Sequence, residues 1–169
     1  VQDEAAQLPA SLLELKTASK VLDMCAAPGG KTTHLLELCE QGTSVTAVDN
    51  NLRRLKLLEE NLCRLKLSCE VVQGDASNRI SWWNGEAFDR ILIDAPCSAS
   101  GVVRRHPDIK IRRRPEELID LCNLQLKILE ESWTMLSKKG ILVYVTCSIF
   151  PEENDLIIEK FLTNQKGVG

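Results

Sequence analysis

The chain has 169 residues, of which 44% are hydrophobic and 27% are charged, and its formal net charge at pH 7 is -3. This composition is ordinary for one globular domain with a sizeable core. No apolar run is long enough to cross a bilayer, which excludes a membrane-spanning class. The polar, acidic N-terminus shows no secretory signal, and because the first residue is not Met we expect a fragment of a longer protein.

Cysteine usage indicates a reducing compartment. There are seven cysteines, an odd number, and none forms a C-x-x-C pair. This pattern predicts reduced thiols in the cytosol and no metal site. Four of the cysteines are expected to be small buried apolar residues: Cys39, Cys63, Cys69 and Cys122.

The N-terminal residues 1–20 are expected to form a helical segment that leads into the core. Residues 3–16 are predicted to be helical, with Asp3 as N-cap and an apolar face made by Leu8, Leu12 and Leu15. Pro9 weakens the middle of this stretch, so two short helices are also compatible with the pattern.

Strand and helix signals then alternate along residues 21–169, which we take as the catalytic domain. The expected strands are 21–26, 44–49, 69–73, 88–94 and 140–146, and the expected helices are 31–40, 51–65, 115–136 and 152–162. Leucine spacing predicts which side of the first two helices faces the core. In helix 31–40 this side carries Leu35, Leu36 and Leu38, and in helix 51–65 it carries Leu55, Leu58 and Leu62. The alternation predicts an α/β fold with a parallel sheet, for which we expect the order 3-2-1-4-5.

The stretch VLDMCAAPGGKTT, residues 21–33, reads as a buried strand, a glycine turn and a helix start. Such a corner binds anions and nucleotides. Its spacing differs from the dinucleotide fingerprint and from the phosphate-binding P-loop, which favours another nucleoside cofactor. A purely structural turn between strand and helix is the alternative.

Three aspartates, Asp49, Asp75 and Asp94, sit at or just past the ends of successive strands. Ligands of open α/β sheets bind at that edge. Asp49 is placed to reach ribose hydroxyls, and Asp75 is placed for the base of a nucleoside. A single aspartate of this kind would usually be a capping or turn residue, but three after a glycine corner favour the nucleoside interpretation.

Cys97 and Cys147 each follow a predicted strand that would lie beside the other in the order 3-2-1-4-5. Adjacent strands are about 4.8 Å apart, so the two thiols are predicted to emerge side by side at the cofactor edge. A thiolate is a strong nucleophile once its pKa is lowered or a base removes its proton. A structural role is the alternative for either cysteine taken alone.

Residues 104–114, RRHPDIKIRRR, hold six Lys or Arg side chains and one Asp, although the whole chain is acidic. Such a concentration is typical of a phosphate-binding patch. A solvated loop, or a helix face paired with Glu116 and Glu117, is the alternative.

CAAPGGKT (25–32), DAPCSASG (94–101) and TCSIFPEEN (146–154) together resemble the RNA (cytosine-5)-methyltransferases of the RsmB/Sun and NOL1/NOP2 type. The resemblance covers essentially the whole chain. The run DAPCSASGVVRRHPDIK is especially close to members that act on bacterial 16S ribosomal RNA. The family implies a Rossmann-like class I methyltransferase fold and S-adenosylmethionine as cofactor.

The resemblance also implies residue roles. The cofactor-binding residues would be Cys25, Ala26, Ala27, Pro28, Gly29, Gly30, Lys31, Asp49, Asp75 and Asp94. Cys147 would attack C6 of the target cytosine, Cys97 would help to release the product, and Asp94 would stabilise the base at N3. The base must leave its stack to reach such a pocket. RNA contacts are expected from Lys31, Arg104, Arg105, His106 and Lys110.

The chain departs from the family in extent. We expect this sequence to lack the family's N-terminal NusB-like RNA-binding domain, and, because few residues follow 162, also strands six and seven of the usual sheet. We therefore expect a monomeric methyltransferase domain that acts on small-subunit ribosomal RNA, with an inactive RNA-binding fragment as the alternative. A NAD-dependent oxidoreductase is disfavoured by the absent G-x-G-x-x-G.

Overall fold

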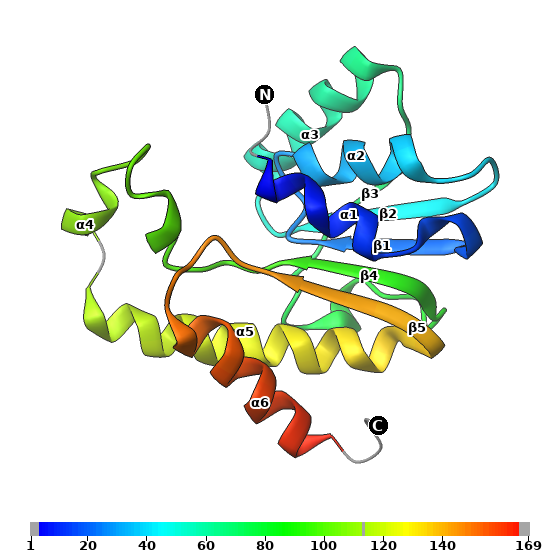
Figure 1. The fold of residues 1–169 in the computed structure, drawn as a ribbon. Helices are drawn as coiled ribbons and strands as arrows, with labels where there is room; N and C mark the ends of the chain where they lie inside the picture. The colour runs from blue at the N-terminus through cyan, green and yellow to red at the C-terminus, as the bar shows by residue number, and fades with distance from the viewer. Residues whose placement is uncertain (1–3, 113, 166–169) are drawn as a thin grey trace. The chain divides into compact units, whose positions relative to one another are not determined.

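The computed structural model describes residues 4–112 and 114–165, whose path is drawn in Figure 1. These residues divide into two compact units: unit 1 comprises residues up to 94 together with 131–145, and unit 2 comprises 95–130 and the residues from 146 onward. Unit 1 contains the 3-10 helices η1 (Ala5–Gln7), η2 (Leu15–Thr17) and η3 (Arg79–Ser81), the helices α1 (Leu8–Leu12), α2 (Gly30–Leu38) and α3 (Leu52–Leu65), and the strands β1 (Lys20–Met24), β2 (Ser44–Asp49), β3 (Glu70–Gln73), β4 (Phe88–Asp94) and β5 (Leu136–Val145). No helix among the described residues has the length and apolar character needed to span a membrane.

The sheet of unit 1 is parallel, as the alternation of strands and helices predicted, and it has the expected order β3-β2-β1-β4-β5. Its central strands are rich in β-branched and aliphatic residues, which suits strands that are covered on both faces. The register pairs Met24 of β1 with Val48 of β2 and with Ile93 of β4. The carboxyl ends of these three strands therefore lie at one edge of the sheet.

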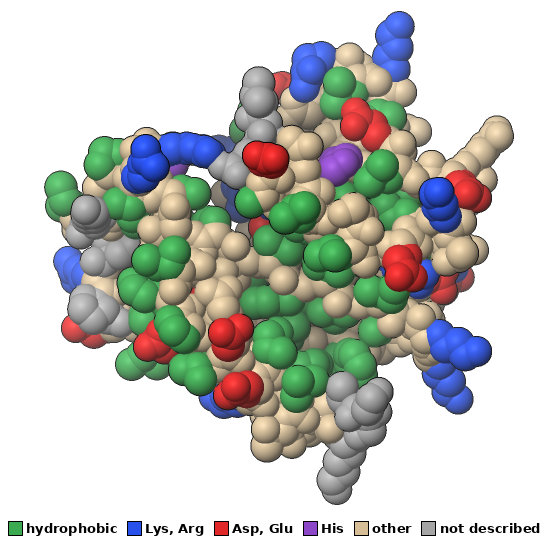
Figure 2. Space-filling view, in the orientation of Figure 1, with side chains coloured by type: hydrophobic (Ala, Val, Ile, Leu, Met, Phe, Trp, Pro, Cys, Tyr) green, Lys and Arg blue, Asp and Glu red, His purple; other side chains and the backbone are tan. Residues whose placement is uncertain are grey.

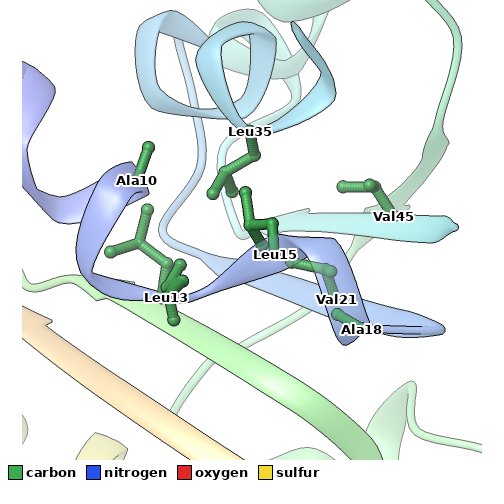
Figure 3. Close-up of a cluster of buried hydrophobic side chains, with 8 residues drawn as sticks. Ala10, Leu13, Leu15, Ala18, Val21, Leu35 and Val45 are labelled. Atoms are coloured by element: carbon green, nitrogen blue, oxygen red, sulfur yellow. The ribbon is translucent and has the colours of Figure 1, made fainter. Parts of the chain in front are cut away.

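Two groups of buried apolar side chains hold the helices of unit 1 against the sheet. Figure 3 shows the first, in which Leu13 and Leu15 lie with Leu35 of α2, Val21 of β1 and Val45 of β2. The second group packs Leu58 and Leu62 of α3 against the strand edge through Ala26, Ala27 and Ala47. Close packing of small alanines against leucines brings α3 near the turn that follows β1.

The N-terminal segment differs from its predicted helix. Leu8 and Leu12 are 60% and 62% exposed, whereas Leu13 and Leu15 are buried, so the predicted apolar face was wrong at two of its three positions. The cause is a break at Glu14, whose left-handed backbone (φ +49°) separates α1 from η2 and turns the following residues inward. Pro9 lies in the first turn of α1, a position that accommodates proline. The predicted cap Asp3 lies outside the described residues.

The other predicted elements of unit 1 agree with the structure to within a few residues, apart from the start of the last strand, and two predicted side-chain positions also differ. Leu38 is exposed because α2 ends there, and Cys63 is exposed on the outer side of α3, so neither is a core residue. The last strand starts at Leu136, earlier than predicted, with an irregular register between Phe88 and Arg90 of β4.

Unit 2 contains the loops that follow β4 and β5 and the helical elements attached to them. These elements are η4 (Ser100–Val102), α4 (Ile109–Arg112), the first part of α5 (Pro115–Met135), η5 (Pro151–Glu153) and α6 (Asp155–Asn164). The short helix α4 was not predicted, because residues 104–114 were interpreted only as a basic segment. The predicted last helix is split, since η5 is separated from α6 at Asn154.

Candidate active site

The turn after β1 forms a corner whose conformation depends on Cys25 and Gly29. Both residues have positive φ angles, +61° and +98°. The N–H of Ala26 donates to the Val48 carbonyl at 3.0 Å, which fixes the turn to β2, and the N–H of Gly29 donates to the Ala26 carbonyl at 2.9 Å. Gly29 is the N-cap of α2, so the first N–H groups of that helix begin at the strand edge.

Asp49 is the buried carboxylate of the corner. Its Oδ2 accepts from the N–H of Ala27 at 3.2 Å, and its Oδ1 accepts from the N–H of Asn51 at 3.0 Å. Arg54 of α3 lies 3.6 Å from Oδ2 and also bonds the Ala27 carbonyl. The carboxylate is thus oriented by three partners at the end of β2, where a ribose-binding acid is expected.

Asp75 and Asp94 are the two other acidic residues predicted at this edge. The N–H of Gly74, just before Asp75, donates to the Asp49 carbonyl at 3.1 Å, so these two acids follow neighbouring strands. Asp75 is exposed, and its Oδ1 accepts from the N–H and the hydroxyl of Ser77, each at 2.8 Å. Asp94 accepts from Lys31 Nζ at 2.8 Å in a partly buried ion pair.

Asp23 belongs to the same edge but was not singled out from the sequence. It is fully buried in β1, and its Oδ2 accepts from Thr32 Oγ1 of α2 at 2.6 Å. Burial raises the pKa of Asp23 to about 7, because its effect is larger than that of the hydrogen bond from Thr32, which lowers the pKa. An Asp inside an apolar strand was the available signal, because such a residue needs a partner when it is buried.

Cys25 stays a thiol in this setting. Burial and the carboxylates of Asp49, Asp23 and Asp94 raise the pKa of Cys25 to about 12. The corner therefore offers a neutral sulfur, backbone N–H groups and the carboxylates of Asp49 and Asp94. This donor set fits a cofactor with ribose hydroxyls, an amino group and a cationic centre, which is the chemistry of S-adenosylmethionine.

The two cysteines predicted to meet do meet. Within unit 2, Cys97 Sγ and Cys147 Sγ lie 3.3 Å apart, and the N–H of Cys147 donates to Cys97 Sγ at 3.4 Å. They meet because they follow adjacent parallel strands, three residues after the end of β4 and two after the end of β5. Gly101 allows the loops to touch, since its N–H donates to the Cys147 carbonyl at 2.9 Å and a Cβ there would lie 2.8 Å from that oxygen.

The inner thiol of the pair, Cys97, has a lowered pKa. The hydrogen bond from Cys147 lowers the pKa of Cys97 to about 7, which outweighs the effect of burial. Cys97 is buried and Cys147 is exposed, so a charge formed on the inner sulfur can be passed to the accessible one by a proton shift across 3.3 Å. A nucleophile with an adjacent proton acceptor results.

A buried carboxylate that the sequence did not reveal, Glu153, connects the two cysteine loops. It accepts from the N–H and hydroxyl of Ser98, at 2.8 and 2.5 Å, and from Gln125 Nε2 at 3.0 Å. Burial would raise the pKa of Glu153, but hydrogen bonds from Ser148, Ser98 and Gln125 lower it. Nothing in the run PEEN separates Glu153 from its exposed neighbour Glu152, which is why the residue was missed.

The predicted RNA-binding residues are divided between the units. Arg104, Arg105 and His106 are exposed in unit 2, while Lys31 is paired with Asp94 in unit 1. The side chain of Lys110 lies outside the described residues. The three exposed residues lie between η4 and α4, in a segment whose basic side chains are at the surface.

Comparison with known proteins agrees with this arrangement. A family model described as 16S rRNA methyltransferase RsmB/F matches residues 10–168. Ribosomal RNA small subunit methyltransferase B of Pseudomonas syringae pv. tomato is 52% identical over 167 residues, which is 99% of this chain and 37% of that relative. The crystal structure of PH0851 has a TM-score of 0.93 at 35% identity and covers 98% of this chain and 38% of that chain. NSun6 from Pyrococcus horikoshii has a TM-score of 0.86 at 34% identity, over 96% of this chain and 41% of that chain.

The sheet order and these likenesses define the class as a methyltransferase of α/β fold. More narrowly, the chain belongs to the RsmB/F family of 16S rRNA methyltransferases. The family resemblance and the fold predicted from the sequence are confirmed, and the oxidoreductase alternative is set aside. The chain spans less than half the length of the curated relatives it matches.

Proposed function

We propose that this chain carries the methyl-transfer site of an enzyme that modifies C5 of a cytosine in 16S ribosomal RNA. The observation that supports this most directly is the 3.3 Å approach of Cys97 and Cys147 Sγ. Two thiols, one accessible and one buried, are what an enzyme needs if one sulfur adds to a base and the other assists its release. Bound S-adenosylmethionine would supply the methyl group as an electrophile at its sulfonium centre.

The residues act on the base one after another. Cys147 Sγ, as thiolate, adds to C6 and forms the C6–S bond, and the ring electrons move to C5, which then takes the methyl group. Asp94, oriented by Lys31 at 2.8 Å, is assigned to N3 of the ring while the adduct exists. Loss of the C5 proton returns the electrons to the ring and breaks the C6–S bond. Cys97, after releasing to solvent the proton that it took from Cys147, is assigned to accept the C5 proton as a thiolate.

The residues of the glycine corner are assigned to the cofactor. The positions from Cys25 to Lys31 would contact its methionine part, Asp49 its ribose and Asp75 its adenine. Support comes from the orientation of the Asp49 carboxylate by Ala27 and Asn51 and from the exposure of Asp75 at the neighbouring strand. Arg104, Arg105 and His106 are assigned to RNA phosphates.

The test is transfer of labelled methyl from S-adenosylmethionine to unmodified small-subunit ribosomal RNA by the full-length protein. Cys147→Ala is expected to abolish both turnover and the covalent protein–RNA adduct. Cys63→Ala is the matched control, since Cys63 is an exposed thiol on α3 in unit 1. Full turnover by Cys147→Ala would overturn the assigned nucleophile. Repeating the assay with the 169-residue chain distinguishes an active domain from a fragment that only binds RNA.

A further inference from the structure

An apolar pocket of about 580 Å³ in unit 2 has no part in the chemistry described above. Its hydrophobic wall is made by Val103, Ile109, Leu118, Leu121, Ile149 and Phe150. The volume falls within the usual range for small-ligand sites. Figure 2 shows hydrophobic and basic side chains close together on the side of the molecule where Figure 1 places α4.

The pocket adjoins the cysteine loops through shared residues. Ile149 and Phe150 come two and three positions after Cys147, and Ser100 bonds both the Ile149 N–H and the Ser148 hydroxyl, each at 3.0 Å. Ser98, beside Cys97, also lines it. A ligand in the pocket therefore contacts the same loops that hold the thiols.

Basic residues line the pocket or follow one of its lining residues in the chain. Arg114 lines it, and Arg104 and Arg105 follow the lining residue Val103 directly and are exposed. Glu117 is the acidic residue among the lining side chains. An apolar wall with a phenyl ring, serine hydroxyls and the arginine Arg114 complements a flat base attached to a phosphate.

We propose that this pocket holds one nucleobase of the RNA next to the target cytosine, unstacked from its neighbours and packed on Phe150. This proposal rests on the proposed function for its ligand. Phe150 is 39% exposed and Ile149 is 71% exposed, so a base can cover apolar surface that would otherwise face water. Holding a flanking base would fix the position of the backbone beside the extruded cytosine.

The experiment measures RNA affinity of the full-length protein, separately from methyl transfer. Each nucleotide near the target is replaced in turn by an abasic one. One position is expected to weaken binding about tenfold, the size of a single base–aromatic stacking contact. Phe150→Ala should weaken binding of intact RNA by a similar factor and should show no further loss with the abasic RNA at that position.

Two further variants make the result decisive. Leu118→Gln changes a residue of α5 and none of either cysteine loop, and it should reproduce the loss, whereas Ile80→Ala, at a side chain that is 82% exposed in unit 1, should bind like wild type. If abasic losses persist unchanged in both pocket variants, the base lies elsewhere and the proposal is wrong. The proposal is also wrong if no abasic substitution weakens RNA binding, which is the result expected if another segment of the full-length protein fills the pocket. Absence of methyl transfer with normal abasic effects would instead count against the proposed function.

Discussion

The carboxylate of Glu153 accepts from the backbone N–H of Ser98 at 2.8 Å across 55 positions of sequence. Ser98 follows Cys97, and Glu153 lies six residues after Cys147, so this bond joins the two loops whose thiols meet. Gln125 of α5 donates to the same Oε1 at 3.0 Å and to the Pro96 carbonyl at 2.9 Å. Glu153 is thus a positioning residue for the thiol pair.

Glu153→Gln is expected to lower the free energy of unfolding by about 1–3 kcal/mol, because an amide donor would face the donors that the carboxylate now satisfies. We also expect kcat to fall at least about tenfold, the effect of losing about 1.4 kcal/mol of transition-state stabilisation. Denaturant unfolding and methyl-transfer kinetics measure the two effects. Glu152→Gln, one residue earlier and exposed, should change neither.

A second measurement separates positioning from simple loss of stability. The negative charge of Glu153 raises the pKa of Cys97, so its removal should shift the pH profile of thiolate formation downward if the thiols remain together. Thiolate absorbance followed against pH reads this directly. An upward shift would mean that the hydrogen bond between the sulfurs has been lost.

Cys97→Ala is expected to accumulate a covalent protein–RNA adduct. The accessible Cys147 can still add to the base, but the sulfur assigned to accept the C5 proton is gone, so release slows. The adduct should appear as a slowly migrating band that resists denaturation. The double variant Cys97→Ala with Cys147→Ala is the control and should give no band; turnover by Cys97→Ala at the wild-type rate would contradict the role of Cys97.

Sequence reasoning succeeded where a local pattern determined the structure. The parallel sheet followed from the alternation of strands and helices, and the meeting of Cys97 and Cys147 followed from the expected strand order, which the structure has. Apolar spacing found the inward face of α3, where Leu55, Leu58 and Leu62 are all buried. These features depend on periodicity and on connection rules, which a single sequence contains.

The features that were not predicted from the sequence are those that tertiary contacts determine. Leu8 and Leu12 fit a helical face, but a left-handed residue at Glu14 redirected the burial to Leu13. Glu153 was missed because its partner Ser98 is distant in sequence. The bond of Glu153 spans 55 positions, and Leu13 is buried by residues distant in sequence such as Leu35 and Val45, so local propensity supplies neither result.

Arg104→Gln is expected to weaken RNA binding without changing its sequence preference. If the guanidinium contacts a phosphate, its loss should reduce the slope of log affinity against log salt by about one. Titrations at several salt concentrations measure the slope. Arg53→Gln, on the exposed side of α3, removes the same charge in unit 1 and should leave the slope nearly unchanged. Equal slopes for all three proteins would show that Arg104 contacts no phosphate.

Asp23 makes stability depend on pH. Because burial raises the pKa of Asp23 to about 7, the folded state holds a proton that the unfolded state loses near the ordinary value of 3.8. Stability should therefore fall as pH rises through this window, by at most about 1.4 kcal/mol per pH unit, and level off above it. Asp23→Asn should lack this fall when unfolding is measured across the window. Asp89→Asn is the control: the pKa of Asp89 is lowered, because hydrogen bonds from Ser19, Lys20 and Ser137 outweigh the effect of its partial burial, so its contribution is lost only at more acidic pH.

Gly29 and Gly42 form a matched pair for testing the glycine corner. Their φ angles are +98° and +97°, so replacement by Ala carries the same backbone strain at both, of order 1 kcal/mol. They differ in surroundings: a Cβ on Gly29 would lie 3.0 Å from Leu58 Cγ, whereas a Cβ on Gly42 would meet nothing within 4 Å. Gly29→Ala should therefore lower the free energy of unfolding more than Gly42→Ala, because α3 must also move. Cofactor affinity should fall for Gly29→Ala alone, as calorimetry with S-adenosylmethionine can measure; equal losses in both measurements would show that the contact with Leu58 does not shape the corner.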